Sequence, residues 1–190
     1  MTEKNKGKKR FTALKNNKKD ESILECAICL QNCVHPIKLQ CEHIFCYLCA
    51  KGVANQSQTC PLCRQDISFS LIDHPNLVNS SDQNISNDDK TNDYSWFYEG
   101  RNGWWEYEER LVSEIEEAYQ QSKNDSLTAD NGITSNNSLA QFLIAGYVYV
   151  IDFDRMVQYQ KDNPNRQRKI RRDQKVNIHN CKGVAGLRRK

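Results

Sequence analysis

Residues 26–63 decide the fold of the first half of the chain, and they read CAICLQNCVHPIKLQCEHIFCYLCAKGVANQSQTCPLC. Residues that bind zinc recur in pairs along this stretch: Cys26, Cys29, Cys41, His43, Cys46, Cys49, Cys60 and Cys63. A Cys-x2-Cys turn presents two thiolates on one side of a tight knuckle, and zinc takes four such ligands in a tetrahedron. The spacing therefore predicts two structural zinc ions.

The zinc ions replace an apolar core that so short a segment lacks. A segment of about 40 residues is near the lower limit for folding on its own core, and each structural zinc supplies on the order of 10 kcal/mol or more. The alternatives, coincidental core cysteines or a disulfide framework, fit this spacing poorly in an intracellular chain. Since four protein ligands leave no open coordination position, we expect neither zinc to activate water.

The composition indicates that part of the chain lies outside any packed core. The 190 residues are 38% hydrophobic and 27% charged, whereas globular domains are roughly 45–50% apolar. The longest apolar run, around residues 146–151, is too short to cross a bilayer, and residues 1–19 lack the apolar segment of a secretory signal. We therefore expect no membrane association and a location in the cytosol and nucleus.

Shifts in composition divide the chain into two modules of an α+β protein. We expect a disordered basic arm over residues 1–22, the zinc module over 23–72, and a polar linker over 73–93. The second module covers 94–175 and includes a polar insertion at 122–138. Residues 176–190 form a basic C-terminal segment.

The second module begins with aromatic residues on both sides of a tight turn. Residues 94–98 (YSWFY) and 104–107 (WWEY) flank the sequence GRNG, which is typical of a β-hairpin. Leu111, Ile115, Ala118 and Tyr119 then recur at the spacing of an amphipathic helix. We expect strands over 142–153, 155–160 and 168–173, with turns near 152–154 and 163–165. The module is thus predicted to pack one helix against a curved antiparallel sheet.

The zinc module resembles the RING finger of ubiquitin ligases. The resemblance implies that Cys26, Cys29, Cys46 and Cys49 share one zinc, and that Cys41, His43, Cys60 and Cys63 share the other. It implies an apolar groove for a ubiquitin-conjugating enzyme at Ile28, Val53, Pro61 and Leu62, with Arg64 bridging that enzyme and ubiquitin. Val53 stands where many RING fingers have Trp. Spacing alone leaves open that the apolar residues only support the zinc knuckles.

Aromatic and arginine residues alternate in the second module. Such a mixture suits an anionic, base-containing ligand, although aromatic residues in short strands more often belong to a core. The run WFYEGRNGWWE, residues 96–106, resembles the WWE domain. That resemblance implies binding of iso-ADP-ribose, the internal unit of poly(ADP-ribose). The matching positions are Tyr98, Arg101, Trp105, Tyr149, Gln158, Arg168 and, in the C-terminal segment, Lys182.

The order RING, linker, WWE is similar to that of poly(ADP-ribose)-dependent ubiquitin ligases. The resemblance implies a RING-type ligase without a covalent ubiquitin intermediate, which is activated by ligand binding and ubiquitinates poly(ADP-ribosyl)ated proteins for degradation. It also implies tankyrase-type polymerases as partners and a place in Wnt signalling. Two alternatives stay open: a non-catalytic reader or nucleic-acid-associated scaffold, and a basic RNA binder, whose binding would depend strongly on salt.

Overall fold

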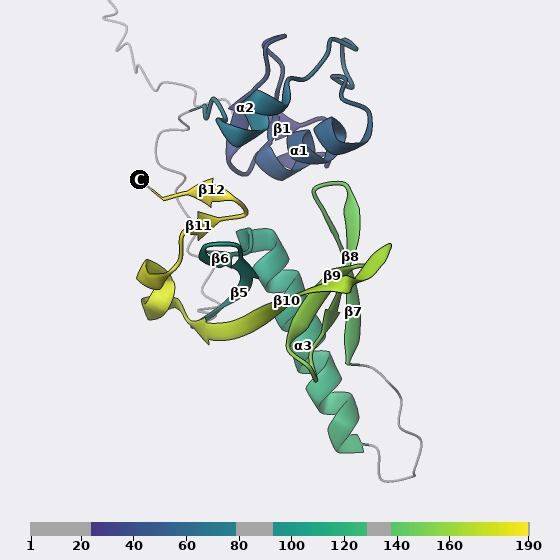
Figure 1. Ribbon diagram of the computed structural model, residues 1–190, viewed down its shortest axis with the longest axis vertical. Helices are drawn as coiled ribbons and strands as arrows, with labels where there is room; N and C mark the ends of the chain where they lie inside the picture. The colour runs from purple at the N-terminus through teal and green to yellow at the C-terminus, as the bar shows by residue number, and fades with distance from the viewer. Residues whose placement is uncertain (1–23, 79–92, 129–137, 190) are drawn as a thin grey trace, which may run out of the picture.

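The computed structural model describes residues 24–78, 93–128 and 138–189. The first and second modules form two bodies that contact each other, with the zinc module drawn above the second module in Figure 1. The disordered arm predicted for residues 1–22 lies outside the described residues, as do most of the linker and residues 129–137 of the insertion.

The zinc module contains little regular structure. Its strands are β1 (Glu25–Cys26), β2 (Gln31–Asn32), β3 (Pro36–Lys38) and β4 (Ile44–Cys46), and its helices are α1 (Tyr47–Gln56) and α2 (Phe69–Asp73). β1 pairs with β2, and β3 pairs with β4, both antiparallel. The buried core centres on Ile37, Phe45 and Ala54, which have no exposed surface. This small core leaves most of the stabilisation to the zinc ligands.

The zinc module extends past the boundary expected at residue 72. The backbone N–H of Val78 donates to the carbonyl of Pro36, and the N–H of Lys38 donates to the carbonyl of Asn76. Leu77 also forms an isolated bridge with Ile37. Residues 76–78 therefore pack on β3 rather than serving as linker.

The second module is the predicted combination of a helix and a curled sheet. Its elements are β5 (Tyr94–Gly100), β6 (Gly103–Glu106), α3 (Glu109–Thr128), β7 (Leu139–Ile144), β8 (Tyr147–Asp152), β9 (Val157–Gln160), β10 (Asn163–Gln174), the 3-10 helix Lys175–Asn180, β11 (Gly183–Val184) and β12 (Leu187–Arg188). The sheet order is β12-β11-β6-β5-β10-β9-β8-β7. All pairs are antiparallel except β11 with β6. Figure 1 shows α3 lying across this curled sheet.

The helix α3 packs its apolar face into the core of the second module. Ile115 is fully buried in one cluster with Trp96 and Ile151 of the sheet and with Phe153, which follows β8. A buried ionic network accompanies this packing, because Glu116 accepts from the indole N–H of Trp96 at 2.8 Å and from Arg172 at 2.7 and 2.8 Å. Burial alone would raise the pKa of Glu116, but these bonds hold that pKa below its ordinary value.

Several boundaries of the second module differ from the sequence predictions. Residues 142–153 were expected as one strand, but Ala145 and Gly146 turn the chain with φ of 49° and 84°, so β7 and β8 form a hairpin. The turn expected at 163–165 falls before β10, which starts at Asn163. The helix α3 reaches Thr128, within the expected insertion. β11 and β12 add residues beyond 175 to the sheet.

Within the described ranges, no helix is long and apolar enough to cross a membrane.

Candidate zinc centres and ligand cleft

The described residues gather the eight predicted zinc ligands into two groups. One contains Cys26, Cys29, Cys46 and Cys49, and the other contains Cys41, His43, Cys60 and Cys63. In each group the ligand atoms all lie within 4.8 Å of one another. This is the pairing that the RING resemblance implies. The chain alternates between the two groups, so each zinc ties together segments that are distant in sequence.

The geometry of both groups fits zinc. Tetrahedral zinc with bonds of about 2.3 Å to sulfur and 2.0 Å to nitrogen sets neighbouring ligand atoms about 3.6–3.8 Å apart. Cys29 and Cys46 sulfurs are 3.8 Å apart, and His43 Nδ1 lies 3.6 Å from Cys60 Sγ and 3.3 Å from Cys41 Sγ. The protein therefore has two closed structural zinc sites.

The residues expected to contact a conjugating enzyme lie at the surface of the zinc module. Ile28 and Val53 are half-buried and pack against the core, whereas Pro61, Leu62 and Arg64 are exposed. Leu62 keeps 55% of its surface accessible. The backbone of Arg64 is in the left-handed region, with φ of 64°, and its N–H donates to the carbonyl of Cys60. The knuckle formed by Cys60 and Cys63 thus carries the exposed apolar residue Leu62, followed closely by the exposed cation Arg64.

A cleft of about 210 Å³ lies between the two modules. The zinc module contributes one wall with Leu48, Lys51 and Asn55 of α1. The second module contributes the opposite walls, whose polar residues include Tyr98, Tyr107, Tyr149, Gln158, Gln160 and Arg168. Any molecule that fills this cleft therefore contacts both modules at once.

Two cations face each other across the cleft. Lys51 comes from α1 and Arg168 from β10. Burial lowers the pKa of Lys51, with Asp73 opposing the shift and Arg168 adding to it. The ammonium group also lies 5.4 Å from the centre of the Tyr47 ring. Neither cation has an ion-pair partner among the described residues. An anionic group in the cleft would relieve their repulsion.

Two buried polar atoms at the cleft lack hydrogen-bond partners within the described residues. They are the hydroxyl of Tyr107 and Oε1 of Gln158, whose side chains are each only 3% exposed. Burial raises the pKa of Tyr98 to about 12 and raises the pKa of Tyr107 well above its ordinary value, so both phenols stay protonated and can donate. Unpartnered buried groups are costly. The cleft therefore offers a donor and an acceptor to a bound polar molecule.

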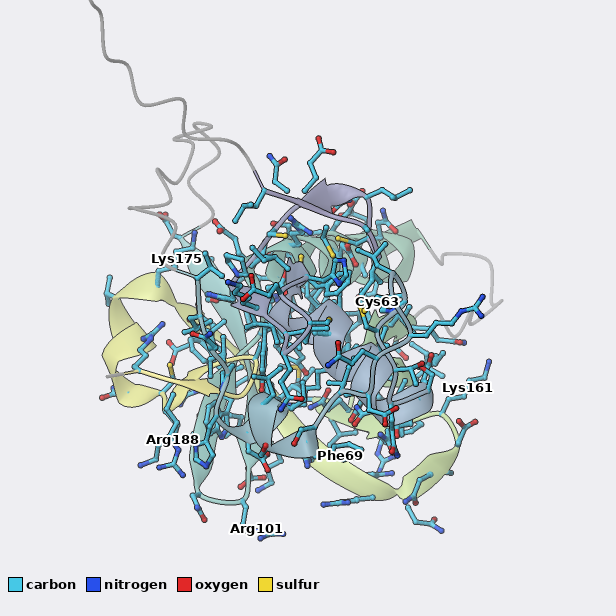
Figure 2. The ribbon with its side chains drawn as sticks, turned by 90° about the horizontal axis from the view of Figure 1, so that it is seen from above. Cys63, Phe69, Arg101, Lys161, Lys175 and Arg188 are labelled. Atoms are coloured by element: carbon cyan, nitrogen blue, oxygen red, sulfur yellow. The ribbon has the colours of Figure 1, made fainter. Side chains whose placement is uncertain are left out.

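The seven predicted ligand residues fall into two groups. Tyr98, Tyr149, Gln158 and Arg168 line the cleft. The other three gather at the turn between β5 and β6: Arg101 occupies the turn, the Trp105 indole packs over Gly100, and the Lys182 stem lies beside Gly103. Figure 2 labels Arg101 at the rim of the molecule. None of these three lines the cleft itself.

Direct contacts hold the two modules together around the cleft. Asn55 and Gln56 donate to the carbonyls of Ala145 and Gly146, at 3.1 and 2.6 Å. These bonds attach the end of α1 to the turn of the β7–β8 hairpin, which Figure 1 shows beneath it. Arg110 at the start of α3 donates to the sulfur of Cys29 at 3.7 Å and also to the carbonyl of Asn32. Leu187 of β12 packs against the core of the zinc module.

Sequence reasoning missed several residues of the cleft, among them Lys51, Tyr107 and Glu108. Tyr107 stands at the end of the quoted aromatic run, so its residue type gave some signal. Lys51 gave none, because its role depends on a module distant in sequence. Glu108 is 7% exposed. Its pKa is raised to about 7, mainly by burial and to a smaller extent by the negative charge of the nearby Cys46. One acidic residue among several at the start of a helix does not indicate such burial.

Comparisons with known proteins agree with this arrangement. Residues 22–70 match the family described as zinc finger, C3HC4 type (RING finger), and residues 94–172 match the WWE domain. The Xenopus tropicalis E3 ubiquitin-protein ligase rnf146 is 44% identical over 182 residues, covering 95% of this chain and 52% of the relative. The Homo sapiens E3 ubiquitin-protein ligase RNF146 is 43% identical over 167 residues, covering 88% and 42%. The Salmo salar protein rnf146, with the same description, is 45% identical over 166 residues, covering 87% and 43%.

The chain thus spans about half the length of the curated relatives it matches. Both domain matches coincide with bodies that the structure shows separately, a zinc module with two closed sites and a curled sheet crossed by one helix. The relatives span both bodies and the segment between them. The chain therefore contains a RING finger followed by a WWE domain, and it resembles these ubiquitin-protein ligases over most of its own length.

Proposed function

We propose that the chain is a RING-type E3 ubiquitin ligase that recognises poly(ADP-ribose) and ubiquitinates poly(ADP-ribosyl)ated proteins for degradation. The observation that carries the proposal is the cleft between the modules, where Lys51 of the RING finger faces Arg168 of the WWE domain. A ligand with phosphates, hydroxyls and a base suits its cations, its unpartnered polar atoms and its aromatic walls. The names of the relatives support the ligase activity.

The RING finger would act by orientation. Ile28, Pro61 and Leu62 provide apolar surface for a conjugating enzyme, while the fixed fork of Arg64 suits a bridge to ubiquitin. When bound, the zinc ions hold the two knuckles that present these residues. Because both sites are closed by four protein ligands, the RING finger supplies no metal-activated water. The catalytic gain would therefore come from holding the thioester in a reactive pose.

The WWE domain would bind one iso-ADP-ribose unit in the cleft. Arg168 and Lys51 would hold phosphate, while Gln158, Tyr98 and Tyr149 would bind ribose hydroxyls and base edges. The unpartnered Oε1 of Gln158 requires a donor, which hydroxyls and amino groups supply and an ionised phosphate does not. The cleft therefore favours a nucleotide-like ligand over inorganic phosphate.

Ligand binding would also activate the ligase. A ligand shifts a conformational equilibrium only by its different affinity for the two states. Because walls from both modules enclose the cleft, a ligand gains its full contacts only when the modules are docked. Docking places Asn55 and Gln56, next to Val53 on α1, against the β7–β8 turn. The ligand would thereby fix the helix that carries part of the conjugating-enzyme groove.

The partners follow from this activity. We infer a conjugating enzyme, ubiquitin and poly(ADP-ribosyl)ated proteins as partners, with tankyrase-type polymerases among those that carry the polymer. The described cysteines form no disulfides, and zinc thiolates persist in reducing compartments, so we infer the cytosol and nucleus. A link to Wnt signalling belongs to the same proposal.

A paired titration tests the proposal. Calorimetry measures the affinity for iso-ADP-ribose, and discharge of ubiquitin from a charged conjugating enzyme is followed over the same ligand range. We expect Arg168→Ala to weaken binding by about tenfold to a hundredfold, since it removes charge-assisted bonds. Arg64→Ala should keep zinc and binding of the conjugating enzyme but slow discharge. Tight binding with a flat discharge rate would contradict activation, and no discharge at all would indicate a non-catalytic reader.

A further inference from the structure

A second hollow, which we call the outer hollow, lies beside the cleft on the WWE domain. It has a volume of about 590 Å³ and is lined by Glu99, Gly100, Arg101, Arg166, Gln167 and Arg168. All six residues come from the β5–β6 turn region and the first half of β10. Arg168 lines both the outer hollow and the cleft, so the two spaces share one wall. A long ligand can therefore pass from one to the other.

The outer hollow has a strong excess of positive charge. Three arginines line it against a single carboxylate, Glu99. In the part of the chain that the structure describes, Arg101, Arg166 and Arg168 form no ion pair. Arg101 and Arg166 are exposed, whereas Arg168 is half-buried between the two spaces. Unpaired guanidinium groups around one hollow are suited to bidentate bonds with phosphate.

A local irregularity of the sheet gives Arg166 its position. The register of β10 against β9 shifts between Asn163, which pairs with Gln160, and Arg168, which pairs with Gln158. The residues between these pairs bulge out of the ladder, and such bulges re-aim side chains near functional sites. The consecutive residues Arg166, Gln167 and Arg168 all line the hollow, which an irregular segment allows and a regularly alternating strand does not.

We propose that the outer hollow binds a phosphate group of the poly(ADP-ribose) unit next to the one in the cleft, with Arg166 as its specific contact. The proposal rests on the proposed function, since it extends the same ligand by one unit. Its consequence is selectivity for polymer: a single iso-ADP-ribose unit occupies the cleft and reaches only Arg101 and Arg168 of the outer hollow, whereas a longer chain also reaches Arg166.

The test compares two ligands on the full chain. The affinities for iso-ADP-ribose and for size-fractionated poly(ADP-ribose) are measured for Arg166→Gln, Arg168→Gln and the unaltered protein. Lys161→Gln serves as a control that removes an exposed cation from the turn before β10, at a different edge of the molecule in Figure 2. Single-stranded RNA is titrated as a second polyanion.

We expect Arg166→Gln to weaken polymer binding by about threefold to tenfold, as one exposed phosphate contact is lost. It should leave the affinity for iso-ADP-ribose unchanged and make polymer binding less dependent on salt. Arg168→Gln should weaken both ligands. The outer site would be overturned if Arg166→Gln weakened the binding of iso-ADP-ribose and of polymer equally, or changed neither affinity. It would also be overturned if Lys161→Gln weakened polymer binding to the same extent. A larger loss for RNA than for polymer would also overturn it, whereas failure of the unaltered protein to bind iso-ADP-ribose would overturn the proposed function itself.

Discussion

Replacing Gly52 by Ala should separate the two modules without harming either fold. Gly52 lies on α1 where this helix meets the β7–β8 turn. A Cβ atom at this position would lie 2.9 Å from the backbone nitrogen of Gly146 and 3.1 Å from the carbonyl carbon of Ala145. Because these neighbours are backbone atoms of a tight turn, no side chain can swing away to make room. The modules must therefore move apart.

The expected loss is set by the bonds next to this contact. Asn55 and Gln56 each donate one hydrogen bond to the same turn. At about 0.5–1.5 kcal/mol each, their loss shifts the docking equilibrium by about 1–3 kcal/mol, or about fivefold to 150-fold. Within α1 the same substitution has the opposite sign, since Ala in a helix is favoured over Gly by about 0.5–1 kcal/mol. The RING finger should become slightly more stable while docking weakens.

Three measurements on Gly52→Ala test this reasoning. Zinc content and thermal unfolding should show an intact RING finger, the affinity for iso-ADP-ribose should fall, and stimulation of ubiquitin discharge should fall with it. Asn55→Ala is the companion variant, because it removes one bond without adding atoms and should cause a smaller loss. Unchanged affinity and full stimulation in Gly52→Ala would refute the claim that docking links the ligand to the RING finger.

Three further variants test the remaining parts of the structure. Tyr107→Phe removes only a buried hydroxyl without a partner, so it should weaken iso-ADP-ribose binding in calorimetry by about threefold to tenfold without lowering the melting temperature; unaltered affinity would remove Tyr107 from the site. Glu116→Gln should lower the free energy of unfolding by about 1.5–3 kcal/mol at neutral pH, since it weakens the bonds to Arg172 and Trp96. The pKa of Glu116 is lowered in the fold, so its stabilisation is complete above the ordinary carboxyl pKa and is lost as the pH falls through the lowered value. Denaturant titrations of Glu116→Gln and of the unaltered protein should therefore give the same free energy of unfolding in acid. A difference in free energy that stays constant with pH would contradict this. Cys46→Ser should unfold the RING finger and release zinc from both interleaved sites in metal analysis, while the near-UV signal of the separate WWE core persists.

The zinc centres were predictable because their geometry is encoded locally. Each Cys-x2-Cys pair forms a knuckle whose two ligands need only a few residues, and the structure gathers all eight predicted ligands. The β5–β6 hairpin was predictable for the same reason, since the GRNG sequence defines a tight turn. By contrast, the β7–β8 turn was missed because Ala145 adopts a positive φ, which its residue type does not favour.

The cleft was predictable only in part. Tyr98, Tyr149, Gln158 and Arg168 follow from the WWE resemblance, and they all line it. Lys51 does not, because its place in the site depends on docking between modules rather than on any local pattern. The separation of Arg101 from the cleft also depends on three-dimensional structure, because the β5–β6 turn that carries Arg101 borders the outer hollow instead.

The two spaces on the WWE domain should contribute differently to function. The cleft has a wall from the RING finger, so its occupant contributes both affinity and docking. The outer hollow is lined by the WWE domain alone, so its occupant has the same contacts in the docked and undocked states. A ligand with equal affinity for two states does not shift the equilibrium between them, however tightly it binds. Polymer length should therefore raise affinity through Arg166 without raising the maximal rate of ubiquitin discharge, which a single iso-ADP-ribose unit at saturation should already reach.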